Sequence, residues 1–249
     1  MIPLTVHQIW LNWGHGWKIP MKYSGFTKTW ELLMPKCNFK LWGDDDVKNV
    51  LVKFPVSYQE MYHNMSFIQR CDLLRLMILY CFGGFYVDMD VEPKRAFDEL
   101  FSKSLVLSKN VRGFTNYFIG AEKRHPFVFA MIKTIYRKHL QPLSFLSSVS
   151  RHHWVIHTTG PEMMNEVVNQ NPRLLLNATY LEPWETSTKT FFGTRIDAPQ
   201  GNVETAICDH LCDGNWLKFN LKEEPWIVFL LIPIVIVCVF VTHSFGIVI

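Results

Sequence analysis

Two acidic residues, Asp88 and Asp90, follow the short apolar run Phe85-Tyr86-Val87 and are separated by a single residue. Where a strand breaks into a turn, carboxylates at this spacing can reach one ligand, yet at about 4 Å and an effective dielectric of about 20 they repel by about 4 kcal/mol. A hard divalent cation offsets that repulsion, and Mg²⁺ or Mn²⁺ held by carboxylates and phosphate oxygens is a common arrangement. The pair is therefore a candidate metal and phosphate site.

An Asp-x-Asp pair is weak evidence by itself, because Asp44 and Asp46 form a second one that is typical of the acidic first turn of a helix. A stronger signal is the pair of charges at Asp72 and Arg75, which lie three residues apart among apolar neighbours and so share a helix face. Two interpretations stay open. The two residues form an internal salt bridge, or the guanidinium offers its paired donors to sugar hydroxyls or phosphate.

The segment from residue 66 to 93 predicts the elements that position these charges. Ser66 and Gln69 fit a capping box at a helix start, and apolar residues then recur at helical spacing up to Phe82. Gly83-Gly84 ends the helix, since glycine adopts a left-handed conformation without a clash. A strand over 85–87 follows, so the acidic pair lies at the strand's carboxyl end, where open α/β sheets bind ligands.

The rest of the soluble part predicts an α/β fold, with a sheet covered by helices. Strands are expected at residues 3–10, 39–42 and 104–108, and a helix at 126–140. Beyond residue 141 the pattern weakens, because Pro, Gly and Thr interrupt every short element. No repeat or low-complexity segment is found over 1–223, which we interpret as one domain.

Composition excludes several classes of protein. The chain has 249 residues, 49% of them hydrophobic, and a formal net charge of +3. It is too apolar to be disordered and too weakly basic for a nucleic-acid-binding protein. The stretch from Trp226 to Val241 has no charged residue. With the residues up to 249, it would form a helix of roughly 36 Å, long enough for a bilayer core of about 30 Å. We therefore expect residues 224–249 to be a transmembrane segment.

The block from Arg70 to Pro93, which contains Asp72, Arg75, Tyr80-x-x-Gly83-Gly84-x-Tyr86 and Asp88-x-Asp90, resembles the DXD-motif glycosyltransferases. That group includes yeast-type α-mannosyltransferases, inositol phosphorylceramide mannosyltransferases, α1,4-sugar transferases and, more distantly, clostridial glucosylating toxins. The family usually has a serine or alanine before the first Asp, where this chain has Cys71. Looser similarities cover most of residues 2–216.

The resemblance implies a GT-A-like nucleotide-sugar-binding sandwich and transfer with retention of anomeric configuration. It implies that Asp72, Arg75, Asp88 and Asp90 are the catalytic residues, and that Mn²⁺ or Mg²⁺ is bound by Asp88, Asp90 and His210. Contacts with the nucleotide-sugar donor, GDP-mannose or a UDP-hexose, are assigned to a further group: His7, Trp10, Asn116, Asn215 and Trp216. In this chain Asn215 stands where the family usually has Ser.

The expected function is a metal-dependent hexosyltransferase whose acceptor is a glycan, a protein or a glycolipid such as an inositol phosphorylceramide-like lipid. Tethering to a membrane favours a membrane-bound acceptor because it raises the local concentration. The location would be a Golgi or ER membrane in a eukaryote, and nucleic acid is not an expected partner. Two alternatives are another metal-dependent phosphate enzyme, such as a nucleotide-sugar hydrolase, and a non-catalytic membrane-tethered sugar-binding protein.

Overall fold

The structure is a computed structural model that describes residues 1–12, 16, 18–110, 113–141, 151–181, 188–189, 195–196 and 206–211. These residues all fall within one compact unit, Met1–Asp213. No helix in these ranges is both long and apolar enough to cross a bilayer. The predicted transmembrane segment 224–249 and the domain boundary before it lie outside the described residues.

A six-stranded mixed sheet forms the centre of the unit, with strand order β2-β1-β3-β6-β5-β7. Its strands are β1 (Thr5–Ile9), β2 (Asn38–Trp42), β3 (Gly84–Val87), β5 (Leu105–Asn110), β6 (Gly113–Ala121) and β7 (Ala178–Leu181). β1 pairs in parallel with β2 and β3, and β7 in parallel with β5, whereas β6 is antiparallel to both β3 and β5. The predicted α/β class is thus confirmed.

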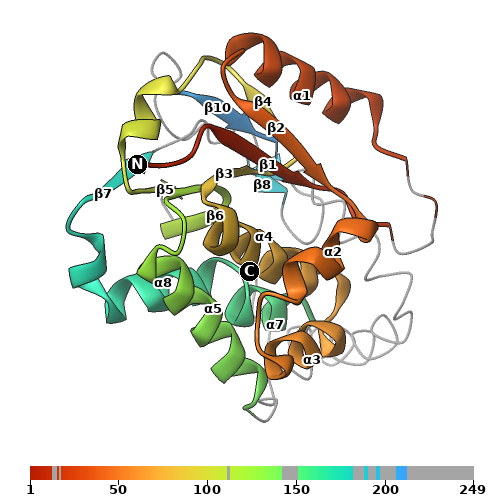
Figure 1. Ribbon diagram of the computed structural model, residues 1–249, viewed down its shortest axis with the longest axis vertical. Helices are drawn as coiled ribbons and strands as arrows, with labels where there is room; N and C mark the ends of the chain where they lie inside the picture. The colour runs from red at the N-terminus through yellow and green to blue at the C-terminus, as the bar shows by residue number, and fades with distance from the viewer. Residues whose placement is uncertain are drawn as a thin grey trace, which may run out of the picture. The chain divides into compact units, whose positions relative to one another are not determined.

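Helices cover both faces of this sheet (Figure 1). They are α1 (Met21–Leu33), α2 (Asp44–Leu51), α3 (Val56–Asn64), α4 (Phe67–Phe82), α5 (Pro126–His139), α7 (Arg151–Thr158) and α8 (Pro161–Gln170). Two 3₁₀ turns, η1 (Asp98–Ser102) and η2 (Pro172–Leu175), and two short ladders complete the described elements. The ladders join β4 (Val91–Pro93) to β10 (Cys208–His210) and β8 (Thr188–Lys189) to β9 (Arg195–Ile196).

The two faces of the sheet carry separate cores because side chains alternate along each strand. Tyr86 on β3 packs in the core that α2 to α5 and α8 complete. Its neighbours Phe85 and Val87 point to the other face, where α1, η1 and the β4–β10 ladder cover them. Figure 1 shows α1, β4 and β10 on one side of the sheet and α4, α5 and α8 on the other.

The elements around the acidic pair form where the sequence predicts them. The main-chain N–H of Ser66 donates to Gln69 Oε1 at 3.2 Å, so the capping box at the start of α4 is present. The helix ends at Gly83, whose φ of +67° and ψ of −169° lie in a region of backbone conformation that is open to glycine and strained for other residues. Only glycine fits at position 84, since a Cβ there would lie 2.5 Å from the main-chain oxygen of Thr5 on β1.

Residues 151–170 are more regular than their sequence indicates. α7 and α8 lie where interruptions by Gly and Pro were expected to break every element. Gly160 is the N-cap of α8 and Pro161 its first residue. Proline fits that position because its missing N–H would have no helical partner there. Gly160 and Pro161, which the sequence indicates as an interruption, therefore begin α8.

Candidate active site

The acidic pair lies in the turn between β3 and β4. The N–H of Asp88 donates to Tyr117 O at 2.9 Å, and the N–H of Val91 donates back to Asp88 O at 3.2 Å, which closes the turn. β10 then brings His210 opposite Val91. This is the carboxyl end of β3, beside the equivalent end of the parallel strand β1, as expected for a ligand-binding edge.

Asp88, Asp90 and His210 each offer a ligand atom, and these atoms all lie within 4.8 Å of one another. His210 Nε2 is 3.6 Å from Asp90 Oδ1, and its ring stacks on Tyr117 with centroids 3.9 Å apart. Two carboxylate oxygens and an imidazole nitrogen suit Mn²⁺ or another borderline divalent ion. The donor set therefore fits a divalent metal, with its remaining positions left for water or phosphate oxygens.

Asp88 also contacts residues on its other side. Tyr86, two residues earlier on the same side of the strand, donates its hydroxyl to Asp88 Oδ1 at 2.6 Å. Arg75 Nη1 is 3.3 Å from the same oxygen, and the guanidinium lies 4.7 Å from the centroid of the Tyr86 ring. Burial raises the pKa of Asp88, Arg75 opposes this change and Asp90 adds to it. A cation at the site would favour the charged form of Asp88 further.

Arg75 joins both parts of the site. Its Nη2 is 3.0 Å from Asp72 Oδ1, so the internal salt bridge, one of the two interpretations left open by the sequence, is present. Its Nη1 also donates to Asn116 O at 2.8 Å. The residue is 7% exposed, and the Nε has no hydrogen-bond partner among the described residues. Arg75 thus compensates two carboxylates from one buried position and retains a donor.

Asp72 is held by donors from three segments. Oδ1 accepts from Arg75 and from Asn116 Nδ2 at 3.0 Å, and Oδ2 accepts from Thr159 Oγ1 at 2.7 Å. Burial raises the pKa of Asp72 to about 6, against the opposing effect of Arg75 and Thr159. Both oxygens of Asp72 are therefore already bonded within the protein.

The residues that were expected to contact the nucleotide-sugar donor differ in their position and burial. His7 is buried within the sheet, where Nδ1 accepts from Trp42 Nε1 at 3.1 Å and Nε2 donates to Gly83 O at 2.8 Å. Both of its ring nitrogens thus serve the fold. Trp10 follows β1 at the carboxyl edge, half-buried, with its ring 6.3 Å from that of Tyr23.

Among the other expected donor contacts, Asn116 is on β6 and bonds Asp72 directly. Asn215 and Trp216 lie outside the described residues.

Three residues that were not among the predicted site residues also shape the site. Tyr86 could have been found from the sequence, because residues two apart on a strand point the same way. Tyr117 and Thr159 could not, since their contacts with His210 and Asp72 join segments far apart in the chain. No local pattern in a single sequence specifies such pairings.

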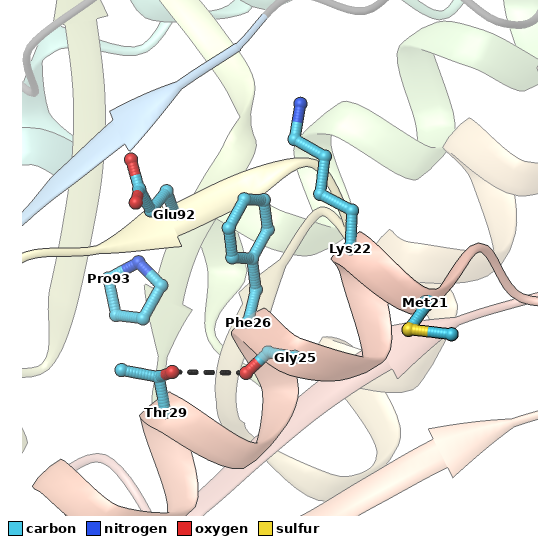
Figure 2. A pocket seen from close by; sticks show the side chains of 7 residues that line it. All are labelled: Met21, Lys22, Gly25, Phe26, Thr29, Glu92 and Pro93. Carbon is cyan, nitrogen blue, oxygen red and sulfur yellow. Dashed lines mark hydrogen bonds between the residues drawn. The ribbon is translucent and has the colours of Figure 1, made fainter.

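A pocket of about 450 Å³ lies between α1 and β4, beside the site (Figure 2). Its lining consists of Met21, Lys22, Gly25, Phe26, Thr29, Glu92 and Pro93. Figure 2 shows the Phe26 ring between Glu92 on β4 and Lys22 on α1. None of the predicted site residues lines it, although Glu92 is only two residues after Asp90.

Comparison with known proteins gives a consistent family. Residues 20–107 match a family model described as "Glycosyltransferase sugar-binding region containing DXD motif". "Inositol phosphoceramide mannosyltransferase 3" of Schizosaccharomyces pombe is 30% identical over 141 residues, which are 55% of this chain and 38% of that protein. "Uncharacterized glycosyltransferase L373" of Acanthamoeba polyphaga mimivirus is 24% identical over 200 residues, 74% of each chain. The chain spans about two fifths of the length of the yeast mannosyltransferases that it matches.

The solved structure titled "PaToxG Glycosyltransferase" superimposes with a TM-score of 0.54 at 16% identity, over 70% of this chain and 73% of that one. Identity at that level shows the fold alone, a mixed α/β sheet fold similar to GT-A glycosyltransferase domains. The matched family region contains Asp72, Arg75, Asp88 and Asp90. The resemblance seen in the sequence is therefore confirmed: residues 20–107 are similar to the sugar-binding region of the DXD-motif glycosyltransferases, and the fold is similar to that of a solved glycosyltransferase.

Proposed function

We propose that this protein is a divalent-metal-dependent glycosyltransferase that moves a hexose from a nucleoside-diphosphate sugar to an acceptor hydroxyl. One observation carries the proposal. Asp88, Asp90 and His210 offer ligand atoms within 4.8 Å of one another at the carboxyl edge of β3, with Arg75 in contact with Asp88. The family match, which covers Arg75, Asp88 and Asp90, supports this assignment.

Each residue has a distinct task in this proposal. Asp88, Asp90 and His210 would hold Mn²⁺ or Mg²⁺, which when bound neutralises the charge that develops on a leaving diphosphate. Tyr86 orients Asp88 by its hydroxyl bond, and Arg75 supplies fixed positive charge beside it. Such preorganised charge acts without reorganisation during the reaction. We further propose that the transfer retains the anomeric configuration, as the resemblance seen in the sequence implies.

The names of the yeast relatives favour a mannosyl donor and an inositol phosphorylceramide-like acceptor. We extend both to this chain as part of the proposal. We also propose that residues 224–249 anchor the protein in a membrane, which would place the site near a lipid acceptor. Retention of configuration is tested by the anomeric signal of the product in proton NMR.

The decisive experiment measures Mn²⁺-dependent release of sugar from GDP-mannose, UDP-glucose and UDP-galactose by the full chain, with and without acceptor. Asp90→Asn should lower the rate by about a hundredfold or more, since a metal supplies several kcal/mol of transition-state stabilisation. The matched control is Asp45→Asn, which removes an exposed carboxylate from α2 and should leave the rate unchanged. Equal rates in the Asp90 and Asp45 variants would overturn the assignment.

Further outcomes separate the alternatives. If the protein releases free sugar and forms no glycoside with any added acceptor, it is a hydrolase. Binding of Mn²⁺ and GDP or UDP without turnover would identify a sugar-binding protein. For the anchor, Ile236→Arg with Val237→Arg should release the chain from carbonate-washed membranes, because each Arg costs about 2.5–3.5 kcal/mol at the centre of a spanning helix. Retention of that double variant in the membrane would contradict the anchor.

A further inference from the structure

The turn between α7 and α8 is fastened to the charged face of α4 by two consecutive threonines. Thr158 Oγ1 accepts from Gln69 Nε2 at 2.8 Å, and Thr159 Oγ1 donates to Asp72 Oδ2 at 2.7 Å. Gln69 and Asp72 are three residues apart, so they share one face of α4. Both threonines are 1% exposed, and hence these bonds are made out of contact with water.

The backbone of this turn is fixed by the residues around it. The N–H groups of Thr159 and Gly160 both donate to Val155 O, at 3.0 and 2.9 Å. A Cβ on Gly160 would lie 2.9 Å from Ile156 Cα, so a larger residue there would have to displace the helix. Pro161 then starts α8. The hydroxyl of Thr159 is therefore presented to Asp72 by main chain that has little freedom to move.

Thr159 completes the set of donors around Asp72. The carboxylate is 5% exposed, and its other oxygen receives Arg75 and Asn116. Loss of the Thr159 hydroxyl would leave Oδ2 without its donor in a site that water does not reach, and such a group turns toward other donors. Any rotation of the carboxylate changes the orientation of both Arg75 and Asn116.

From this geometry we infer that Thr159 is a positioning residue: its hydroxyl holds the Asp72 carboxylate so that Arg75 and Asn116 keep the orientation used in sugar transfer. This inference rests on the proposed function. Thr159 acts through Asp72 rather than by contact with the donor, so it should affect turnover more than donor affinity. Small errors in the placement of catalytic groups are known to cost large factors in rate.

The test compares variants of the full chain in Mn²⁺-dependent hydrolysis of the nucleotide sugar that the unchanged protein turns over best. Thr159→Val should lower kcat by about tenfold or more and leave KM within about twofold. Thr159→Ser, which keeps the hydroxyl, should retain kcat within about threefold. Thr158→Val removes an equally buried hydroxyl that does not touch Asp72, and it should leave kcat within about twofold.

A double-mutant cycle shows whether the effect passes through Asp72. In an Asp72→Asn background, Thr159→Val should cost about twofold or less, because residues that act through one contact are not additive. Urea midpoints identify any variant that fails to fold. If Thr159→Val does not fold, a comparison of the kcat values of Thr159→Ala and Thr159→Ser isolates the effect of the hydroxyl, since both variants lack the methyl group of threonine.

Several results would overturn the inference. One is a Thr159→Val variant with unchanged kcat, and another is an equal loss in Thr158→Val. A tenfold loss that persists in the Asp72→Asn background would show that Thr159 acts elsewhere. An unchanged protein that turns over no nucleotide sugar would overturn the proposed function together with this inference, whereas normal turnover by Thr159→Val would overturn the inference alone.

Discussion

Replacement of Arg75 by Met tests whether the buried charges at the site depend on one another. Arg75 is 7% exposed and lies 3.0 Å from Asp72 and 3.3 Å from Asp88. At about 3 Å and an effective dielectric of about 20, each contact contributes an attraction of about 5 kcal/mol before desolvation. Burial of the guanidinium cancels much of this, so the net loss should be about 3–5 kcal/mol, as when one partner of a buried pair is removed.

The pH dependence of this loss gives a sharper test than its size. Arg75 lowers the pKa of both Asp72 and Asp88 against the effect of burial. Without it, both folded-state pKa values rise further above their unfolded values, so protonation favours the folded variant. The stability deficit of Arg75→Met should therefore shrink as the pH falls from about 7.5 to about 5, by up to about 1.4 kcal/mol per pH unit for each group.

The assay is urea unfolding of the purified full chain, followed by tryptophan fluorescence at several pH values. Arg70→Met serves as the control on the same helix, because Arg70 donates to the main-chain oxygens of Met65 and His63. Its loss should be about 1 kcal/mol and nearly independent of pH. A deficit below about 1 kcal/mol for Arg75→Met, or one that does not change with pH, would refute the coupling of these charges.

Three further predictions concern stability, each measured by urea unfolding. Burial lowers the pKa of His7 to about 4, so protonation favours the unfolded chain and stability should fall by about 3 kcal/mol from pH 6.5 to about 4. His7→Gln should remove that part of the acid sensitivity, and superimposable acid profiles would contradict this. Gly84→Ala should cost about 3 kcal/mol or more because its φ is +103° and the added Cβ meets main chain, whereas Gly25→Ala, in open space on α1, should stabilise by up to about 1 kcal/mol. Lys138 is buried and lies 2.7 Å from Glu166, so Glu166→Ala, which leaves the ammonium group without that partner, should cost about 2 kcal/mol more than Lys138→Met; equal costs would show that the buried ammonium group carries no extra penalty when this partner is removed.

Much of the region around the acidic pair could be predicted because its signals are local. The helix that begins after Ser66, its end at Gly83 and the strand before Asp88 each follow from residues within a few positions of the feature. The bond from Ser66 N–H to Gln69, for instance, joins residues three apart, as a capping box requires. The pairing of Asp72 with Arg75 has the same origin, since helix geometry alone brings them together.

Other features could not be predicted because one residue type can have either of two roles. Gly and Pro can interrupt a helix or start one, and a histidine can contact a ligand or support the fold. Gly160 and Pro161 indicate an interruption when read along the chain, yet they cap and start α8. His7 was expected among the donor contacts from its motif. Its two ring nitrogens bond Trp42 and Gly83, and these bonds depend on the parallel pairing of β1 with β2 and β3.

The amino-acid sequence by itself determined the acidic pair, the charged helix before it and the family they indicate, because these depend on spacings of a few residues. Only the tertiary structure decided which side chains join them. The ring of Tyr117 comes from β6 to stack on His210, and Thr159 comes from a turn 87 residues after Asp72. The sheet register and the helix packing that bring them there arise from burial of apolar side chains throughout the chain, and no single segment contains that information.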